Sequence, residues 1–209
     1  IHSIKNYTND EEELKIIRRH LHKNPELSLK EYNTSKFVLE TLKSFGIEEV
    51  YDDIYETAIL AIIRGKESGK TLLLRGDMDA LPIMEETNLQ FKSCNLGVMH
   101  ACGHDAHITW MLGIAYVLNK LRNEFKGIVK IIFQPSEEKE GGARELLLKR
   151  NILLEEPKVD FAIAGHVWPE INSGEFALVD GVAMGAAYKF KLLIKGIGGH
   201  GAEPHKTVD

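Results

Sequence analysis

Four short runs of mostly apolar residues constrain the fold of this chain more than any other feature of its sequence. They are Ile59–Ile63, Thr71–Leu74, Ile128–Phe133 and Val159–Ala164. Continuous apolar runs of this length are typical of strands that are covered on both faces. Apolar residues with helical spacing mark the segments Asp10–Asn24, Leu29–Phe45, Ile108–Leu121 and Ala143–Leu148. Strands separated by helices predict an α/β fold, with a mostly parallel sheet and helices on both of its faces.

The pattern changes in the last part of the chain. The segment Tyr188–Lys195 alternates apolar residues with lysine, which is the period-two pattern of a strand with one face in solvent. It follows Gly181–Ala187, a run of small residues that can serve as a hinge. We therefore expect one domain over residues 1–183 and the first strand of a second, α+β domain over residues 184–209. Because a lone strand cannot form a domain, we expect the sequence to be part of a longer chain.

Charge and cysteine content argue against several classes of function. The net charge is −5 and there is no basic stripe with interleaved aromatic residues, so no nucleic-acid partner is expected. No apolar run approaches the ~20 residues that a membrane helix needs, so no membrane partner is expected either. Cys94 and Cys102 are too few for a disulfide scaffold, which favours a reducing compartment and a cytoplasmic location.

Polar side chains follow three of the expected strands, at the point where each strand ends. Asp77 and Asp79 follow one strand, Glu137 and Glu138 follow another, and His166 follows a third. Open α/β sheets bind their ligands outside the carboxyl ends of the strands, where loops and helix N-termini meet. We therefore expect these five side chains to converge on one site.

A fourth segment adds metal-ligand chemistry to the same edge. Cys102 and His104 stand two residues apart across Gly103, directly before an expected helix. Cysteine, histidine and carboxylate are ligands of zinc and other first-row divalent ions. An extended backbone at the glycine would let both side chains face one ion. The sequence therefore predicts a metal site in the first domain.

Each of these residues also has an ordinary structural interpretation. His166 alone would be a histidine at the rim of the core, and Cys102 alone would be a small buried apolar residue. Glu137 and Glu138 could be the acidic first turn of a helix, and the two aspartates could hold a loop. Convergence of all of them at one edge favours the metal site. Five further residues are expected to have no direct role, although His107 lies close enough to contact a ligand; they are His20, His22, Cys94, His100 and His107.

These motifs resemble a known family, the zinc-peptidase-like aminoacylases and carboxypeptidases. The greatest similarity is to its amidohydrolase branch, which contains hippurate hydrolases, indole-acetyl-amino-acid hydrolases and N-acetyldiaminopimelate deacetylases. The matching segments, in order, are Arg18–Glu26, Arg75–Pro82, Met99–His107, Phe133–Glu138, Gly165–Pro169 and Gly196–Asp209. The resemblance covers nearly the whole chain, and the Met99–His107 motif is its most specific part.

The resemblance implies a zinc-exopeptidase-like catalytic domain, incomplete over residues 1–183, and the start of a lid and dimerisation domain. It implies two divalent metal ions, zinc or manganese. Four residues would be ligands: Cys102, His104, Glu138 and His166. Glu137 would be the general base, Asp79 would orient a ligand, and His200 of the glycine-rich loop would reach the substrate carbonyl, often across a homodimer. A last histidine ligand would lie beyond residue 209.

The implied activity is hydrolysis of the amide bond of small N-acyl amino acids by a metal-activated water. Two alternatives remain open. In one, Cys102 is a thiol nucleophile with a histidine as its base, although this leaves Glu137, Glu138 and His166 without a task. In the other, the 209 residues only bind metal or dimerise, and are inactive on their own.

Overall fold

The computed structural model describes residues 10–139, 141–182, 184–186, 188 and 190–208. The chain divides into two compact units, Ile1–Trp168 and Pro169–Asp209, and each is described by itself. Among the helices of the described residues, none has the length and apolarity required to cross a membrane.

The first unit is built on a five-stranded sheet in the order β1-β2-β4-β3-β5. Its strands are β1 (Glu49–Tyr51), β2 (Ile59–Arg64), β3 (Glu67–Asp77), β4 (Lys126–Gln134) and β5 (Phe161–Ala164). Its helices are α1 (Asp10–Lys23), α2 (Tyr32–Ser44), α3 (His104–Lys120) and α4 (Gly142–Lys149). The predicted α/β fold class is confirmed.

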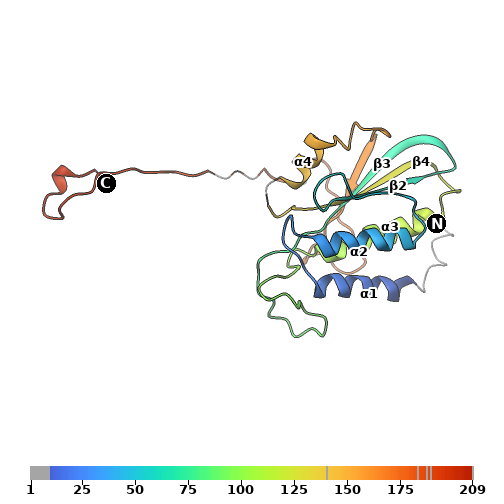
Figure 1. Ribbon diagram of the computed structural model, residues 1–209, viewed down its shortest axis with the longest axis horizontal. Helices are drawn as coiled ribbons and strands as arrows, with labels where there is room; N and C mark the ends of the chain where they lie inside the picture. The colour runs from blue at the N-terminus through green and yellow to red at the C-terminus, as the bar shows by residue number, and fades with distance from the viewer. Residues whose placement is uncertain (1–9, 140, 183, 187, 189, 209) are drawn as a thin grey trace. The chain divides into compact units, whose positions relative to one another are not determined.

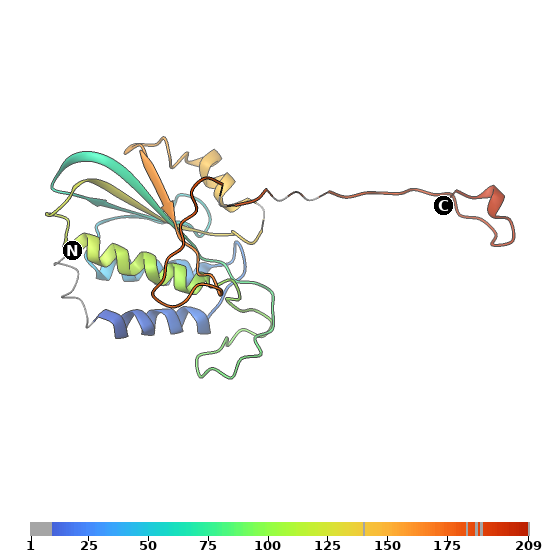
Figure 2. The same ribbon diagram turned by 180° about the vertical axis from the view of Figure 1, so that it is seen from behind.

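Each face of the sheet carries its own core, because successive side chains of a strand point to opposite faces. On β2, Ile59, Ala61 and Ile63 belong to the cluster that includes α1, α2 and α3. Leu60 and Ile62 belong to the second cluster, which includes α4. Helices therefore cover both faces of the sheet, with α1, α2 and α3 on one side and α4 on the other (Figure 1 and, from behind, Figure 2).

The sheet is mostly parallel, as the apolar runs predicted, but one strand is reversed, because β2 runs against the other four. β3 pairs in parallel with β4 and β5, but β2 pairs antiparallel with β1 and β4. The cause is the short connection between β2 and β3, where Gly65 and Lys66 donate their amides to Gly127 O and Phe125 O beside β4. A parallel crossover needs roughly a dozen residues or more. Such a short connection therefore reverses the chain direction.

Two helices begin three or more residues away from the predicted start. α3 starts at His104 and not at Ile108, because its first turn is polar yet buried and so lacks the apolar signal. α2 starts at Tyr32 and not at Leu29, whose φ of 60° places it in the left-handed region. The three-residue strand β1 was not predicted, since a segment so short carries no clear period.

The second unit has little regular structure among its described residues. It contains the 3-10 helix η2 (Pro204–Lys206) and an isolated antiparallel bridge between Ile197 and Val208. The described residues of 188–195 form no strand. A strand needs a neighbour to supply backbone hydrogen bonds, and the described part of the chain pairs none with this segment. The predicted strand and the domain division after residue 183 therefore stay predictions.

Candidate metal centre

The polar residues predicted at strand ends meet at the carboxyl edge of β3, β4 and β5. Asp77 is the last residue of β3, and Glu137 follows the end of β4 at Gln134. His166 follows β5, and His104 is the first residue of α3. Because β3 is parallel to both of its neighbours, their carboxyl ends lie at one edge. The topology thus delivers these donors to one place.

Glycine is required between the two donors of the Cys102–His104 segment. Gly103 is the N-cap of α3 and has φ 83° and ψ 19°. This left-handed conformation is unfavourable for residues other than glycine. A Cβ at this position would also lie 2.4 Å from Cγ2 of Val167. This glycine lets the chain turn sharply into α3, so that Cys102 and His104 both face the segment after β5.

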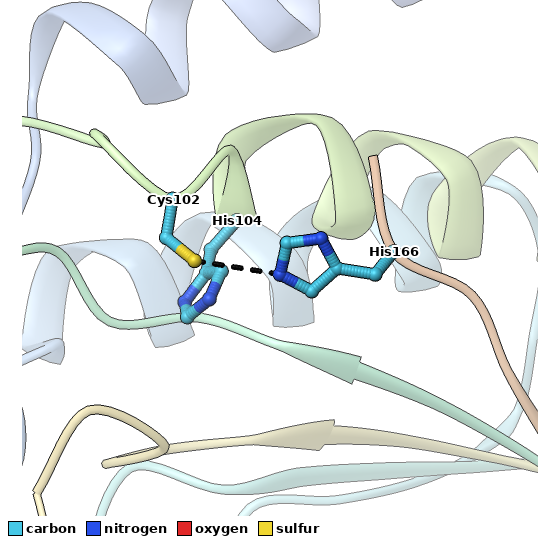
Figure 3. A group of neighbouring side chains, drawn as sticks. All are labelled: Cys102, His104 and His166. Carbon is cyan, nitrogen blue, oxygen red and sulfur yellow. Dashed lines mark hydrogen bonds between the residues drawn. The ribbon is translucent and has the colours of Figure 1, made fainter. Parts of the chain in front are cut away.

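Cys102, His104 and His166 form one of three groups in which the candidate ligand atoms all lie within 4.8 Å of one another. Figure 3 shows their side chains converging from the start of α3 and from the segment after β5. The Cys102 Sγ and His166 Nε2 atoms are 3.4 Å apart. This is less than twice the ~2.3 Å length of a zinc–sulfur bond, so one ion can contact both.

The tautomer of His166 suits a ligand. Its Nδ1 lies 2.5 Å from the Val167 carbonyl oxygen, which can only accept a hydrogen bond. Nδ1 therefore carries the proton, and Nε2 presents its lone pair toward Cys102. Ligand histidines typically donate their second ring N–H to a carbonyl or carboxylate in this way.

His104 belongs to all three groups, and the other two join it to Asp77 with His107 and to Glu137 with Glu138. We call the residues of these three groups, together with Asp79, the His104 cluster. His104 is fully buried, yet neither of its ring nitrogens makes a hydrogen bond within the described chain. Burial lowers the pKa of His104, but the nearby Asp79 and Asp77 outweigh it, and the pKa is raised overall.

The distances around His104 are those of an ion pair rather than of a hydrogen bond. Nδ1 lies 3.4 Å from Asp79 Oδ1, and Nε2 lies 3.7 Å from Asp77 Oδ2. Nε2 is 3.8 Å from Glu138 Oε1 and 3.9 Å from Glu137 Oε2. Carboxylates surround the ring without bonding to it, which leaves a buried donor set with unused capacity.

Asp79 holds the segment that carries the two glutamates. Its Oδ1 accepts the Glu137 amide at 3.0 Å, and its Oδ2 accepts the Glu138 amide at 3.0 Å. Oδ2 also accepts the Ser28 hydroxyl at 2.6 Å. Burial raises the pKa of Asp79, but His104 and these donors outweigh it and lower the pKa overall. The carboxylate is thus placed to orient both His104 and the turn at residues 136–138.

His107, for which the sequence predicted no direct role, links two parts of the cluster. Its Nε2 accepts the Val167 amide at 3.0 Å, so its proton is on Nδ1, which lies 2.6 Å from Asp77 Oδ1. Burial raises the pKa of Asp77, but His107, His104 and Arg75 outweigh it and hold the pKa at about 2. The position of His107 beside the Cys102–His104 motif was the available signal for this contact.

The pKa values of the Cys102 thiol and of the nearby Glu138 carboxyl are both raised above their ordinary values. Burial, followed by the Glu138 carboxylate, raises the pKa of Cys102 to about 12. Burial likewise raises the pKa of Glu138, whose Oε1 is buried and has no hydrogen-bond partner in the described chain. In the absence of a cation, the cluster thus favours a protonated thiol.

The remaining predicted site residue, His200, lies in the second unit. It is exposed, and its Nδ1 accepts the Ala202 amide at 3.2 Å. Cys94 is exposed as well, and His20 stacks on Phe37. His100 is buried with neither ring nitrogen hydrogen-bonded, and burial lowers its pKa to about 4.

Comparison with known proteins identifies the class of protein to which this fold and site belong. Residues 73–204 match the peptidase family M20/M25/M40, and the chain belongs to that family. This range contains Cys102, His104, Glu138 and His166, the predicted metal ligands within the sequence, and the predicted base Glu137.

Two curated relatives and one solved structure are closely similar. Thermostable carboxypeptidase 1 of Saccharolobus solfataricus is 45% identical over 194 residues, covering 92% of this chain and 49% of its own. An N-acyl-L-amino acid amidohydrolase of Geobacillus stearothermophilus is 42% identical, with 92% and 51% covered. The structure of a dinuclear metal binding M20 peptidase from Bacillus subtilis superposes with a TM-score of 0.71 at 42% identity, covering 76% and 43%. The chain thus spans about half the length of these curated relatives.

Proposed function

We propose that the full-length protein hydrolyses the amide bond of N-acyl amino acids, and that the His104 cluster is its metal centre. The observation that carries this proposal is His104 itself, a fully buried histidine among carboxylates with both ring nitrogens unbonded in the described chain. Buried polar atoms without partners are rare and costly. A cation at this position would satisfy both the histidine and the unpartnered Glu138 Oε1.

The donor set fits divalent metal ions. Cys102, His104, Glu138 and His166 would hold them, as a mixed sulfur, nitrogen and oxygen set. Sulfur among the donors favours zinc, while manganese remains an alternative because of the carboxylates. Two ions, as in the dinuclear relative, would supply the charge that lets water lose its proton near neutral pH.

Glu137 is the candidate general base. It neighbours Glu138 in sequence, and its side chain is 40% exposed, so a substrate or water can reach it. It would accept the proton of the attacking water and pass it to the leaving amine, a role typically worth 10²–10⁴-fold in rate. Glu137 and Glu138 thus divide proton transfer and metal binding between neighbouring residues.

His200 would donate a hydrogen bond to the substrate carbonyl as charge develops on its oxygen. It lies on the glycine-rich loop of the second unit, which we propose is the beginning of the lid and dimerisation domain. The carboxypeptidase and amidohydrolase names of the relatives describe one chemistry, since both reactions release an amino acid from an amide bond. The small substrate would therefore carry a free carboxylate beside the scissile amide.

A thiol hydrolase remains the second candidate because Cys102 Sγ lies 3.4 Å from a histidine nitrogen. Its chemistry needs a thiolate, which is the nucleophilic form of cysteine. The pKa of Cys102 is raised to about 12 by burial and by Glu138, which disfavours the thiolate without a cation. The surrounding charges therefore favour the metal centre.

Metal analysis combined with a substrate screen tests the proposal. Full-length protein should bind two divalent ions and cleave members of a panel of N-acetyl, N-benzoyl and indole-acetyl amino acids. Removal of the ions with a chelator should abolish turnover, and zinc or manganese should restore it. Turnover that survives chelation but is lost on thiol alkylation would favour the thiol hydrolase instead. The 209-residue chain alone should bind metal but show negligible turnover.

A further inference from the structure

Glu31 is a buried carboxylate that neither the metal centre nor its own helix explains. It is 0% exposed and stands directly before α2 as its N-cap residue, yet its side chain makes no capping hydrogen bond. Within the described ranges no basic side chain forms an ion pair with it. Burial raises its pKa. Burying a carboxyl group costs free energy unless hydrogen bonds or an ion pair compensate it.

The capping task at α2 belongs to a different residue, Glu26. Its Oε1 accepts the Asn33 amide at 3.2 Å, and its Oε2 accepts the Thr34 amide at 2.8 Å. Both amides are in the first turn of α2, where free N–H groups need acceptors. The side chain of Glu31 is therefore available for a contact elsewhere.

The Glu31 side chain instead contacts the turn at Ser136, directly before the candidate base Glu137 and the candidate ligand Glu138. Glu31 Oε1 accepts the Ser136 amide at 2.9 Å, while Thr57 donates its hydroxyl to Oε2 at 2.7 Å. The next two amides, of Glu137 and Glu138, go to Asp79, as described above. Three successive N–H groups are thus held by two buried carboxylates that reach the turn from distant parts of the sequence.

The backbone of this turn needs such support. Ser136 has a φ of 54°, a left-handed conformation that a residue with a side chain adopts only where its surroundings enforce it. The N-terminus of α4 also packs against this turn, so closely that a Cβ on Gly142 would lie 2.0 Å from the Pro135 carbonyl oxygen. The turn is therefore in contact with both α4 and Glu31.

We infer that Glu31 is a positioning residue, whose hydrogen bond to the Ser136 amide sets the turn that aims Glu137 and Glu138 at the metal centre. This inference rests on the proposed function. Residues that orient metal ligands are typically worth ~10–100-fold in metal affinity or activity. A displacement of about 1 Å in a catalytic group can cost ~10²-fold in rate. The Glu31 carboxylate bonds to Ser136 and Thr57, neither of which is a candidate metal ligand, so its effect on the metal centre must pass through the turn.

Three variants of the full-length protein test this role. Glu31→Ala removes the acceptor of the Ser136 amide. Glu31→Gln keeps an oxygen for that amide and an NH₂ group that can donate to Thr57, so it should rescue the function. Glu26→Ala is the matched control, because it removes another N-terminal carboxylate that accepts backbone amides but does not contact the turn. Glu31→Asp, which shortens the side chain, replaces Glu31→Ala if that variant fails to fold.

Three measurements apply to each variant: Zn²⁺ affinity by chelator competition, kcat and KM at saturating Zn²⁺, and hydrogen exchange in metal-free protein. Glu31→Ala should weaken Zn²⁺ binding by ~10–100-fold, lower kcat by ~10²-fold with little change in KM, and accelerate exchange at residues 136–138. Glu31→Gln should restore all three. Glu26→Ala should accelerate exchange at the start of α2 and leave Zn²⁺ affinity and kcat unchanged.

The outcomes separate this inference from the proposed function. Glu31→Ala with wild-type Zn²⁺ affinity, kcat and exchange at residues 136–138 would overturn the inference, even if the melting temperature fell. Wild-type protein that binds Zn²⁺ but cleaves no N-acyl amino acid would overturn the proposed function, and the affinity of Glu31→Ala would still decide the role of Glu31. If wild-type protein bound no Zn²⁺, exchange at the turn would decide it.

Discussion

The first two residues of α3 belong to two different buried groups of histidine and carboxylate. His104 faces the carboxylates of the His104 cluster, and Asp105 faces His22 of α1. We call His22, Asp105, Glu85 and Arg18 the His22 cluster. Both clusters combine histidine with several carboxylates in the interior of the protein, so their composition alone does not distinguish them.

Hydrogen bonding distinguishes the two. Both ring nitrogens of His22 have carboxylate partners, Asp105 Oδ2 at 2.7 Å and Glu85 Oε1 at 3.1 Å. His104 has no carboxylate oxygen nearer than 3.4 Å among its ion-pair contacts and no hydrogen bond in the described chain. A histidine with both ring nitrogens bonded to carboxylates has no lone pair left for an ion, whereas a neutral histidine without such bonds can offer the lone pair of one nitrogen. This difference supports the proposal that the His104 cluster binds metal and that the His22 cluster has a structural role.

The largest expected effect separates the two functions within the His104 cluster. Glu137→Gln should lower kcat by ~10²–10⁴-fold, because only proton transfer is lost, and should keep the metal content. Glu138→Ala should instead lose metal. Kinetics and metal analysis of the full-length variants measure both. Equal metal content in the two variants would contradict this division of labour.

The next test makes the same substitution, histidine to alanine, in each of the two clusters. His22→Ala removes the imidazole that bonds to both Asp105 and Glu85, and breaking a buried pair in this way typically costs ~3–5 kcal/mol in the free energy of unfolding. The metal content of the folded variant should not change. His104→Ala should lose metal. Denaturant titration with metal analysis of both proteins would show the comparison to be wrong if His22→Ala lost its metal while remaining folded.

In metal-free protein, the buried histidines His22 and His100 should change the free energy of unfolding with pH in opposite directions. Asp105 raises the pKa of His22 above 6.5, despite burial, so the stability from this pair is fully present below pH 6.5 and is lost as pH rises through the folded pKa. Burial lowers the pKa of His100 to about 4, so stability is lost as pH falls from 6.5 toward 4.

Each unit of pKa shift corresponds to ~1.4 kcal/mol. Unfolding free energies measured between pH 4 and pH 8 should therefore pass through a maximum near pH 6.5. His22→Gln should make the alkaline side less steep, with the raised pKa of His104 accounting for part of what remains, and His100→Phe should make the acidic side less steep. If His22→Gln left the alkaline side of the stability profile unchanged, or His100→Phe the acidic side, the role given to that histidine would be wrong.

The smallest expected effect is at the rim of the His22 cluster. Arg18 Nε lies 3.0 Å from Asp105 Oδ2, but the Arg18 side chain is 39% exposed. Exposed ion pairs typically contribute ~0–1 kcal/mol, and His22 still holds Asp105. Arg18→Gln should therefore change the unfolding free energy by no more than this and leave the metal content unaltered. A loss as large as that of His22→Ala would mean that the guanidinium, and not the imidazole, holds the cluster together.

Local patterns were sufficient for most of the elements in the first unit. The strands and helices follow from hydrophobic period and from helix-ending residues, which are properties of neighbouring residues. Errors arose where local and tertiary requirements differ. The first turn of α3, for example, is polar because its side chains face the His104 cluster and the His22 cluster.

By itself the sequence determined the α/β class, the placement of donors at strand ends and the family resemblance, because strand ends and motif spacing are local. Only the tertiary structure decided which donors remain without partners. His22 and His104 are indistinguishable by residue type, and the bond from Glu31 to Ser136 joins segments far apart in the chain. Whether a buried polar group finds a hydrogen-bond partner depends on the distance between segments that are far apart in sequence. No local sequence pattern contains that distance.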